Sequence, residues 1–175
     1  ESFVLGCGAP LLPSIGAVDG MRVGEDTAPF WNPGLSGIQG ANAYWALKNP
    51  ILRSFMHKKW WLNDPDCLLL RRRESALAPN EIEMYARTAG GLDNMIIESD
   101  DLELVDKEGR ELLREAIRLK GGHVRVRGLL EDDVYIIDSW GGPSGIFRYA
   151  ANLSDSDRRS GAREIPHRTG VFLKP

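Results

Sequence analysis

Residues 18–31 read Val-Asp-Gly-Met-Arg-Val-Gly-Glu-Asp-Thr-Ala-Pro-Phe-Trp, and we expect the rest of the chain to be organised around this stretch. If its first half is extended, alternate side chains share a face, so Arg22 and Asp26 point the same way across Gly24. A glycine between them leaves space that a ligand can fill. Trp31 adds an aromatic plane of the kind that covers the apolar face of a sugar. The alternative interpretation is a surface ion pair at a strand end, with Trp31 in the core.

The composition is that of a soluble globular protein. The chain has 175 residues, of which 42% are hydrophobic and 27% charged, and its formal net charge is -3. This length suits one domain or two small ones. The charge balance predicts no nucleic-acid partner, and the absence of a long apolar run predicts no membrane-spanning segment.

Cysteine and histidine usage predicts neither a disulfide framework nor a metal site. Cys7 and Cys67 are the two cysteines, and the three histidines are scattered. We therefore expect no metal and no cofactor, and a reducing compartment, most simply the cytoplasm. The first residue is Glu1 and no secretory pattern precedes the fold, so we expect either that a segment was removed or that this is a piece of a longer chain.

The first 121 residues alternate between short apolar strands and helical segments, which predicts parallel βα units. Pro50 should break or kink the first helix, and Asn80 should cap the second. Glycine pairs end the second and third helices. The expected strands are 2–6, 21–24, 67–70 and 95–98, and the expected helices are 36–57, 79–91 and 108–120.

The pattern changes after Gly121-Gly122, where we place a domain boundary. Alternating segments joined by tight turns predict an antiparallel sheet. The fold class is therefore α/β over 1–121, followed by an all-β domain over 122–175. The expected strands are 124–129, 134–140, 145–152 and 171–173, with a turn at 131–133.

Polar side chains stand at or next to an end of each predicted parallel strand, and we expect them at the edge where such sheets gather ligand groups. Several of them have a structural alternative. Asp64 could cap a turn, Asp100 and Asp101 could cap a helix, and Cys7 could be a small buried hydrophobic residue. The pairs are Cys7 and Gly8, Arg22 and Asp26, Asp64 and Asp66, and Asp100 and Asp101.

Four blocks of sequence resemble the C-terminal half of the α-galactosidases of glycoside hydrolase family 36, the melibiase clan. They are Leu-Gly-Cys-Gly-Ala-Pro-Leu-Leu-Pro-Ser (5–14), the stretch 18–31, Leu-Asn-Asp-Pro-Asp-Cys-Leu-Leu-Leu-Arg (62–71) and Ser-Asp-Asp-Leu (99–102). The resemblance covers most of residues 2–120. It implies the last four βα units of a (β/α)8 TIM barrel, followed by an antiparallel β-sandwich.

The same resemblance implies an activity and assigns residues to it. The family hydrolyses terminal α-galactosides, such as melibiose and raffinose, with retention of configuration. Asp26 matches its acid/base and Arg22 the arginine that holds the sugar, which we expect to bind a substrate hydroxyl and not Asp26 directly. Cys7 and Gly8 match the loop that lines the galactose pocket, and Trp31 is a further substrate-binding candidate. The family's nucleophile lies upstream of these blocks, so no residue here takes that role.

Several alternatives stay open at this stage. The 175 residues alone would be a catalytically inert fragment or a galactoside-binding remnant, since a lone general acid cannot carry a double displacement. Half a barrel exposes strand edges that invite association, for example as a homo-oligomer. Within the enzyme class, the same machinery serves α-N-acetylgalactosaminidases and galactosyl transfer.

Overall fold

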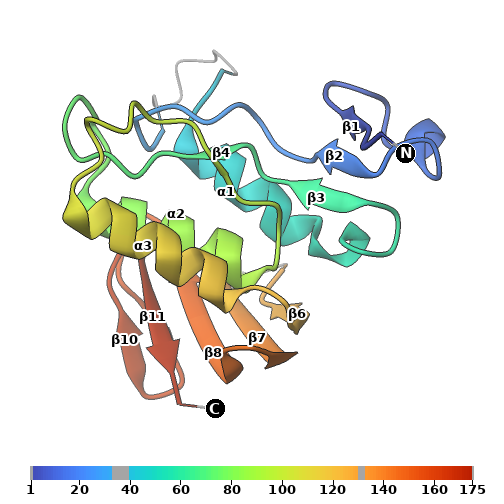
Figure 1. The fold of residues 1–175 in the computed structure, drawn as a ribbon. Helices are drawn as coiled ribbons and strands as arrows, with labels where there is room; N and C mark the ends of the chain where they lie inside the picture. Colours follow the sequence, from blue (N-terminus) through green and yellow to red (C-terminus); the bar gives the residue numbers. More distant parts are fainter. Residues whose placement is uncertain (1, 33–39, 130–132, 175) are drawn as a thin grey trace.

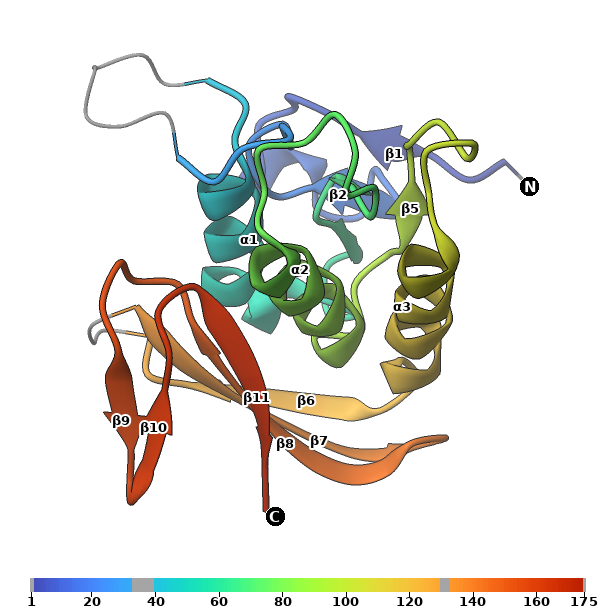
Figure 2. The same cartoon turned by 90° about the vertical axis from the view of Figure 1, so that its left-hand side faces the viewer.

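The protein is arranged in three layers. The computed structural model describes residues 2–32, 40–129 and 133–174. Short parallel strands form one side, three helices lie in the middle and an antiparallel sheet forms the other side (Figure 1). The view turned by 90° shows the same order, with the helices between the N-terminal strands and the C-terminal sheet (Figure 2).

The N-terminal strands are short and all parallel. They form one sheet of order β1-β2-β3 and one pair, β4-β5, and the Met95 amide donates to the Asn63 carbonyl at 2.9 Å, which joins the two. This confirms parallel pairing, whereas the assignment of these strands to the last four βα units of a (β/α)8 barrel stays a prediction. The strands are β1 (Leu5–Gly6), β2 (Gly20–Arg22), β3 (Leu62–Asp64), β4 (Cys67–Leu68) and β5 (Ile97–Glu98).

Three α-helices follow three of the parallel segments, and two of them begin at a side-chain cap. Asn42 accepts from the Trp45 amide at 2.8 Å, and Asp106 accepts from the Gly109 amide at 2.8 Å. Such caps satisfy amides that have no partner within the helix. The helices are α1 (Ala43–Leu52), α2 (Pro79–Gly91) and α3 (Lys107–Leu119), with 3₁₀ turns η1 (Leu12–Ser14) and η2 (Ser54–Met56).

Two predicted caps were wrong. Helix α2 begins one residue after Ala78, whose amide donates to the Glu81 carboxylate at 2.8 Å. Asn80 instead donates to the carbonyl of Arg168 at 2.9 Å, so it ties the helix to the C-terminal sheet. The cap of α3 is Asp106, five residues beyond Asp101.

Pro50 does not end helix α1, which continues to Leu52. Because Pro50 stands in the last turn, it removes a single intrahelical bond, to the carbonyl of Ala46. The predicted start of this helix, at residue 36, lies outside the described residues.

The C-terminal sheet has the strand order β11-β8-β7-β6, all antiparallel. Two further strands, β9 and β10, form an antiparallel ribbon, and β10 contacts β8 and β11. This ribbon was not predicted. A second full sheet, as a sandwich requires, stays a prediction, and the predicted turn at 131–133 lies largely outside the described residues. The strands are β6 (His123–Arg127), β7 (Val134–Gly142), β8 (Gly145–Asn152), β9 (Arg158–Ser160), β10 (Arg163–Ile165) and β11 (Thr169–Leu173).

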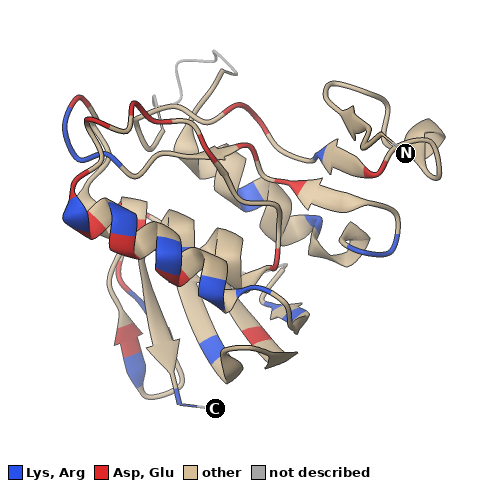
Figure 3. Cartoon of the chain, viewed as in Figure 1, with Lys and Arg blue, Asp and Glu red and all other residues tan. Residues whose placement is uncertain are grey.

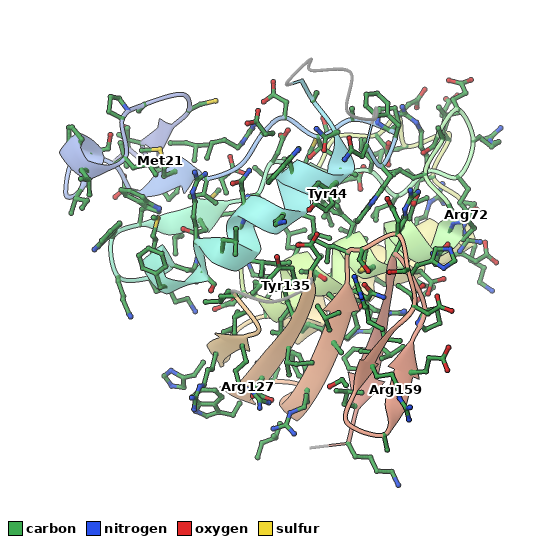
Figure 4. All side chains as sticks on the ribbon, turned by 180° about the vertical axis from the view of Figure 1, so that it is seen from behind. Met21, Tyr44, Arg72, Arg127, Tyr135 and Arg159 are labelled. Atoms are coloured by element: carbon green, nitrogen blue, oxygen red, sulfur yellow. The ribbon has the colours of Figure 1, made fainter. Side chains whose placement is uncertain are left out.

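One hydrophobic core extends across residue 121. Tyr135 and Tyr149 of the sheet belong to the same buried cluster as Ala86 and Ala89 of α2. Figure 4 shows Tyr135 on the side of the sheet that faces the helices, and Arg127 on the far side. Among the described helices, none has the length and apolar character needed to span a membrane.

Helices α2 and α3 touch at Gly90, where a side chain has no room. A Cβ on Gly90 would lie 2.3 Å from the Ala116 carbonyl oxygen. We predict that Gly90→Ala lowers the free energy of unfolding by about 1–3 kcal/mol, because the helices must separate. Urea unfolding followed by circular dichroism measures this change.

The neighbouring glycine is a matched control. A Cβ on Gly91 would meet nothing closer than 3.6 Å, at the Phe147 ring. Gly91→Ala should therefore leave stability unchanged or raise it by up to about 1 kcal/mol, since alanine favours helix. Equal losses in the two variants would contradict a tight α2–α3 contact.

Candidate functional site

The guanidinium of Arg22 is shared by three carboxylates at the carboxyl ends of two neighbouring strands. Its Nε lies 3.1 Å from Asp64 Oδ2, one terminal nitrogen 2.9 Å from Asp66 Oδ1, and the other 3.0 Å from Asp26 Oδ1. Arg22 ends β2, and the pairing of Arg22 with Asp64 in the β2–β3 register brings these groups together. This set of four residues is called the Arg22 cluster below.

The backbone on both sides of Asp26 is held in place. The Thr27 amide donates to Asp66 Oδ2 at 2.7 Å, and the Asp26 carbonyl accepts from the Asn42 amide at 2.9 Å. Asp66 thus bonds to both Arg22 and Thr27, which precede and follow Asp26 in the sequence. The Asp26 carboxylate is positioned by its neighbours although few atoms cover it.

Burial differs sharply within the Arg22 cluster. The Asp64 side chain is fully buried and that of Arg22 is 18% exposed, whereas that of Asp26 is 77% exposed. Burial alone would lower the pKa of Arg22, but the hydrogen bond and charge of Asp64, with Asp66 and Cys7, raise it. The cation is therefore permanent, and three carboxylates around one guanidinium leave an excess of negative charge at the surface.

The contact between Arg22 and Asp26 differs from the sequence-based hypothesis that Arg22 binds substrate and not Asp26. Asp64 and Asp66 fix the guanidinium so that its remaining nitrogen faces Asp26. The predicted ligand space at Gly24 was also wrong, because helix α1 fills it. A Cβ on Gly24 would lie 3.3 Å from the Ala46 carbonyl oxygen.

Trp31 lies in the core, 5% exposed, and meets the Tyr44 ring edge-on with the centroids 5.8 Å apart. The guanidinium of Arg168 lies 5.9 Å from the centroid of its ring. This placement agrees with the structural alternative, a core tryptophan. As a substrate-binding residue, Trp31 stays a prediction without a contact to the Arg22 cluster in this structure.

Cys7 and Gly8 lie beside the Arg22 cluster. Gly6 of β1 pairs with Met21 of β2, so Cys7 leaves β1 next to Arg22. The Cys7 thiol is exposed, and Gly8 adopts a φ of 65°, a left-handed conformation that favours glycine. The structure therefore brings together Cys7, Arg22, Asp26, Asp64 and Asp66, as predicted from their positions at strand ends, and Gly8 follows Cys7 in the chain.

The polar residues after β5 have structural partners instead. Asp100 accepts from the amides of Leu70 and Arg71 and pairs with the Arg71 guanidinium at 3.1 Å. Asp101 accepts from the Glu103 amide at 3.0 Å. These bonds fix two loops at the edge of the sheet.

Sequence reasoning missed Tyr85 and Thr27. The hydroxyl of Tyr85 on α2 lies 2.9 Å from the hydroxyl of Thr27, and burial raises the pKa of Tyr85. Tyr85 lies within the predicted helix 79–91, where an aromatic residue is most simply part of the core. No sequence signal marks its hydroxyl, because its partner is 58 positions away. The pair links α2 to the residue that follows Asp26.

Solved structures that resemble this chain are glycoside hydrolases, so the chain has the fold of part of such an enzyme. No family model matches the sequence. A β-L-arabinopyranosidase of glycoside hydrolase family 27 from Geobacillus stearothermophilus aligns over 94% of this chain and 47% of its own, with a TM-score of 0.68 and 14% identity. At that identity the likeness concerns the fold alone.

The sequence is more similar to an α-galactosidase from Thermus thermophilus. Its complex with stachyose is 32% identical over 69% of this chain and 27% of that chain, with a TM-score of 0.53. Its complex with p-nitrophenyl α-D-galactopyranoside is 27% identical over 78% of this chain and 28% of that chain, with a TM-score of 0.60. The aligned part is therefore under a third of that enzyme's length.

Asp64 and Asp26 should differ in their effect on stability. We predict that Asp64→Ala costs about 2–3 kcal/mol of unfolding free energy, because it strips a buried partner from Arg22. Asp26→Ala should cost less than about 1 kcal/mol, because that ion pair is exposed. Urea unfolding of the two variants at the same pH gives both values. A larger loss for Asp26→Ala would show that the exposed pair holds the cluster together.

Glu98 gives the fold a pH dependence. Burial, together with the charge of Asp100, raises the pKa of Glu98 to about 7, and one of its oxygens is buried without a partner among the described residues. Because the folded state holds this proton more tightly than the unfolded state, the stabilisation is complete below the unfolded pKa and is lost as pH rises through about 7.

We therefore expect the wild-type protein to lose stability relative to Glu98→Gln between pH 5 and pH 8. The difference should be roughly 1–2 kcal/mol, since Glu98 is only partly buried. Unfolding in urea across this range measures it for both proteins. Parallel profiles would contradict a raised pKa in the folded state.

Proposed function

We propose that this chain is part of a retaining α-galactosidase of glycoside hydrolase family 36, with Asp26 as the acid/base. The observation that carries the proposal is the Arg22 cluster, in which an exposed carboxylate stands beside a fixed cation at the carboxyl edge of parallel strands. The identity of 32% to an α-galactosidase supports it. The parallel strands and the C-terminal sheet fit the last four βα units of a TIM barrel and a β-sandwich.

The contact between Arg22 and Asp26 suggests how a substrate would engage the site. In the free protein one guanidinium nitrogen lies 3.0 Å from the exposed Asp26 carboxylate. We infer that a bound galactoside takes this nitrogen for one of its hydroxyls, which leaves the Asp26 carboxyl to face the glycosidic oxygen. In this role Asp26 gives its proton to the leaving group and afterwards takes a proton from the attacking water.

The second carboxylate of the reaction must come from residues other than those of the Arg22 cluster. Retaining enzymes place a nucleophile roughly 5–5.5 Å from the acid/base. Asp64 is buried against Arg22, and Asp66 is held by Arg22 and the Thr27 amide, so neither is free to attack a sugar. In this proposal the Arg22 cluster supplies one half of the catalytic pair, the acid/base.

A second candidate is a polypeptide that is inert alone, or that only binds galactosides. The observation in its favour is the extent of the alignment, which covers 27% to 28% of the Thermus thermophilus enzyme. Assay of the 175 residues with p-nitrophenyl α-D-galactopyranoside tests this directly. We expect no turnover, and turnover would show that a nucleophile exists within this chain.

The acid/base assignment is tested in the complete enzyme to which we assign this chain. Asp26→Ala should slow hydrolysis of raffinose by roughly 10²- to 10⁴-fold, because its leaving group needs protonation. A nitrophenyl α-galactoside, whose leaving group departs without a proton, should be affected far less in its first step. Steady-state and burst kinetics on the two substrates measure the difference.

A control variant separates chemistry from folding. Asp101→Asn changes another strand-end carboxylate, one that accepts a hydrogen bond from the Glu103 amide within its own turn, so the variant should retain activity on both substrates. Equal losses on raffinose and on the nitrophenyl substrate in Asp26→Ala would count against the acid/base role.

A further inference from the structure

A hollow of about 460 Å³ lies between the segment 54–59 and the edge strand β6 of the C-terminal sheet. It is separate from the Arg22 cluster, because residues 54–59 precede β3 at its amino end whereas Asp64 stands at its carboxyl end. We call it the basal hollow. Its lining residues include Phe55, Lys58, Lys59, His123, Arg125 and Trp140.

Aromatic side chains make two walls of the basal hollow. Trp140 and His123 are cross-strand neighbours whose rings stack with the centroids 5.8 Å apart. Trp140 is 42% exposed and Phe55 is 52% exposed. Large aromatic surfaces left open in a concave site offer flat apolar area to a ligand.

The charge of the basal hollow is positive, in a chain whose net charge is -3. Among the described residues that line it there is no Asp or Glu. Lys58 pairs with Asp93 outside the lining, whereas Lys59 and Arg125 make no ion pair with the described residues. The surface of α3 differs, because Lys and Arg alternate there with Glu (Figure 3).

Neutral hydrogen-bonding groups are also available there. Strand β6 pairs only with β7 among the described strands, so one edge of its backbone is open where Val124 and Val126 line the hollow. The ring of His57 is not among these groups, because its Nδ1 accepts the Asn63 amide and its buried Nε2 lies 3.7 Å from the Asp93 carboxylate. The N–H and C=O groups along the open edge of β6 suit hydroxyl groups.

We propose that the basal hollow binds a pyranose that carries a carboxylate or a phosphate. The sugar's apolar face lies against Trp140, its hydroxyls meet the open edge of β6, and its anionic group pairs with Lys59 and Arg125. The volume of the hollow suits a mono- or disaccharide. This site does not depend on the function proposed for the Arg22 cluster.

Nuclear magnetic resonance of the whole chain tests the proposal, with glucuronate and glucose 6-phosphate as probes. Trp140→Phe identifies the indole N–H signal of Trp140, since that signal alone disappears. We expect this signal to shift saturably with at least one of the two anionic sugars, and the stronger of them shows which anion is preferred. Glucose and inorganic phosphate should bind at least about tenfold more weakly, because glucose lacks the anionic group and inorganic phosphate lacks the sugar ring.

Variants then locate the contacts. Arg125→Gln should weaken the anionic sugar about tenfold, through the loss of a charge-assisted bond. Trp140→Ala should weaken it about three- to tenfold, through the loss of aromatic contact. Arg114→Gln, an equal charge change at an exposed position of α3 paired with Glu111, is the matched control and should bind as the wild type does. Circular dichroism checks that each variant is folded.

Three outcomes would overturn the proposal. One is the absence of a saturable shift with either anionic sugar. Another is inorganic phosphate or adenosine monophosphate binding as tightly as the sugar phosphate, which would mean a general anion or nucleotide site. The third is unchanged affinity in folded Arg125→Gln and Trp140→Ala.

Discussion

Helix α2 is covered on both sides, and the rest of the structure depends on this constraint. One side packs against the parallel strands and α1, and the other against the C-terminal sheet and α3. Gly90 lets α3 approach so closely that no Cβ fits between the helices. Because the helix is shared, β4, through Leu68, has a common core with the C-terminal sheet, whereas Met21 and Val23, which flank Arg22, belong to a second buried cluster.

The Arg22 cluster combines a rigid support with an exposed reactive group. Arginine suits this role because its planar guanidinium presents separate nitrogens to separate carboxylates. Two of the carboxylates are anchored, Asp64 by burial and Asp66 by the Thr27 amide, whereas Asp26 faces solvent. The charge and position of the Arg22 guanidinium are therefore fixed before any ligand binds. Only its contact with Asp26 has to change when a ligand enters.

Local patterns in the sequence predicted much of this arrangement, and distant contacts account for what they missed. Alternation placed Arg22 and Asp26 together, because strand geometry needs only neighbouring residues. Gly24 was misassigned because its space is filled by a helix about twenty positions later. Trp31 carried two interpretations, and only the tertiary fold places it in the core. The ribbon over 158–165 escaped prediction because its strands are mostly charged and lack an apolar alternation.

Arg168 connects the C-terminal sheet to the segment that carries the proposed acid/base. It pairs with Glu81 of α2 at 2.9 Å and covers the ring of Trp31, five positions after Asp26. The sheet therefore cannot be exchanged freely. An unrelated β-domain in its place would remove the cation over the Trp31 indole and the ion-pair partner of Glu81. A chimera must therefore keep Arg168 together with the strands of the sheet.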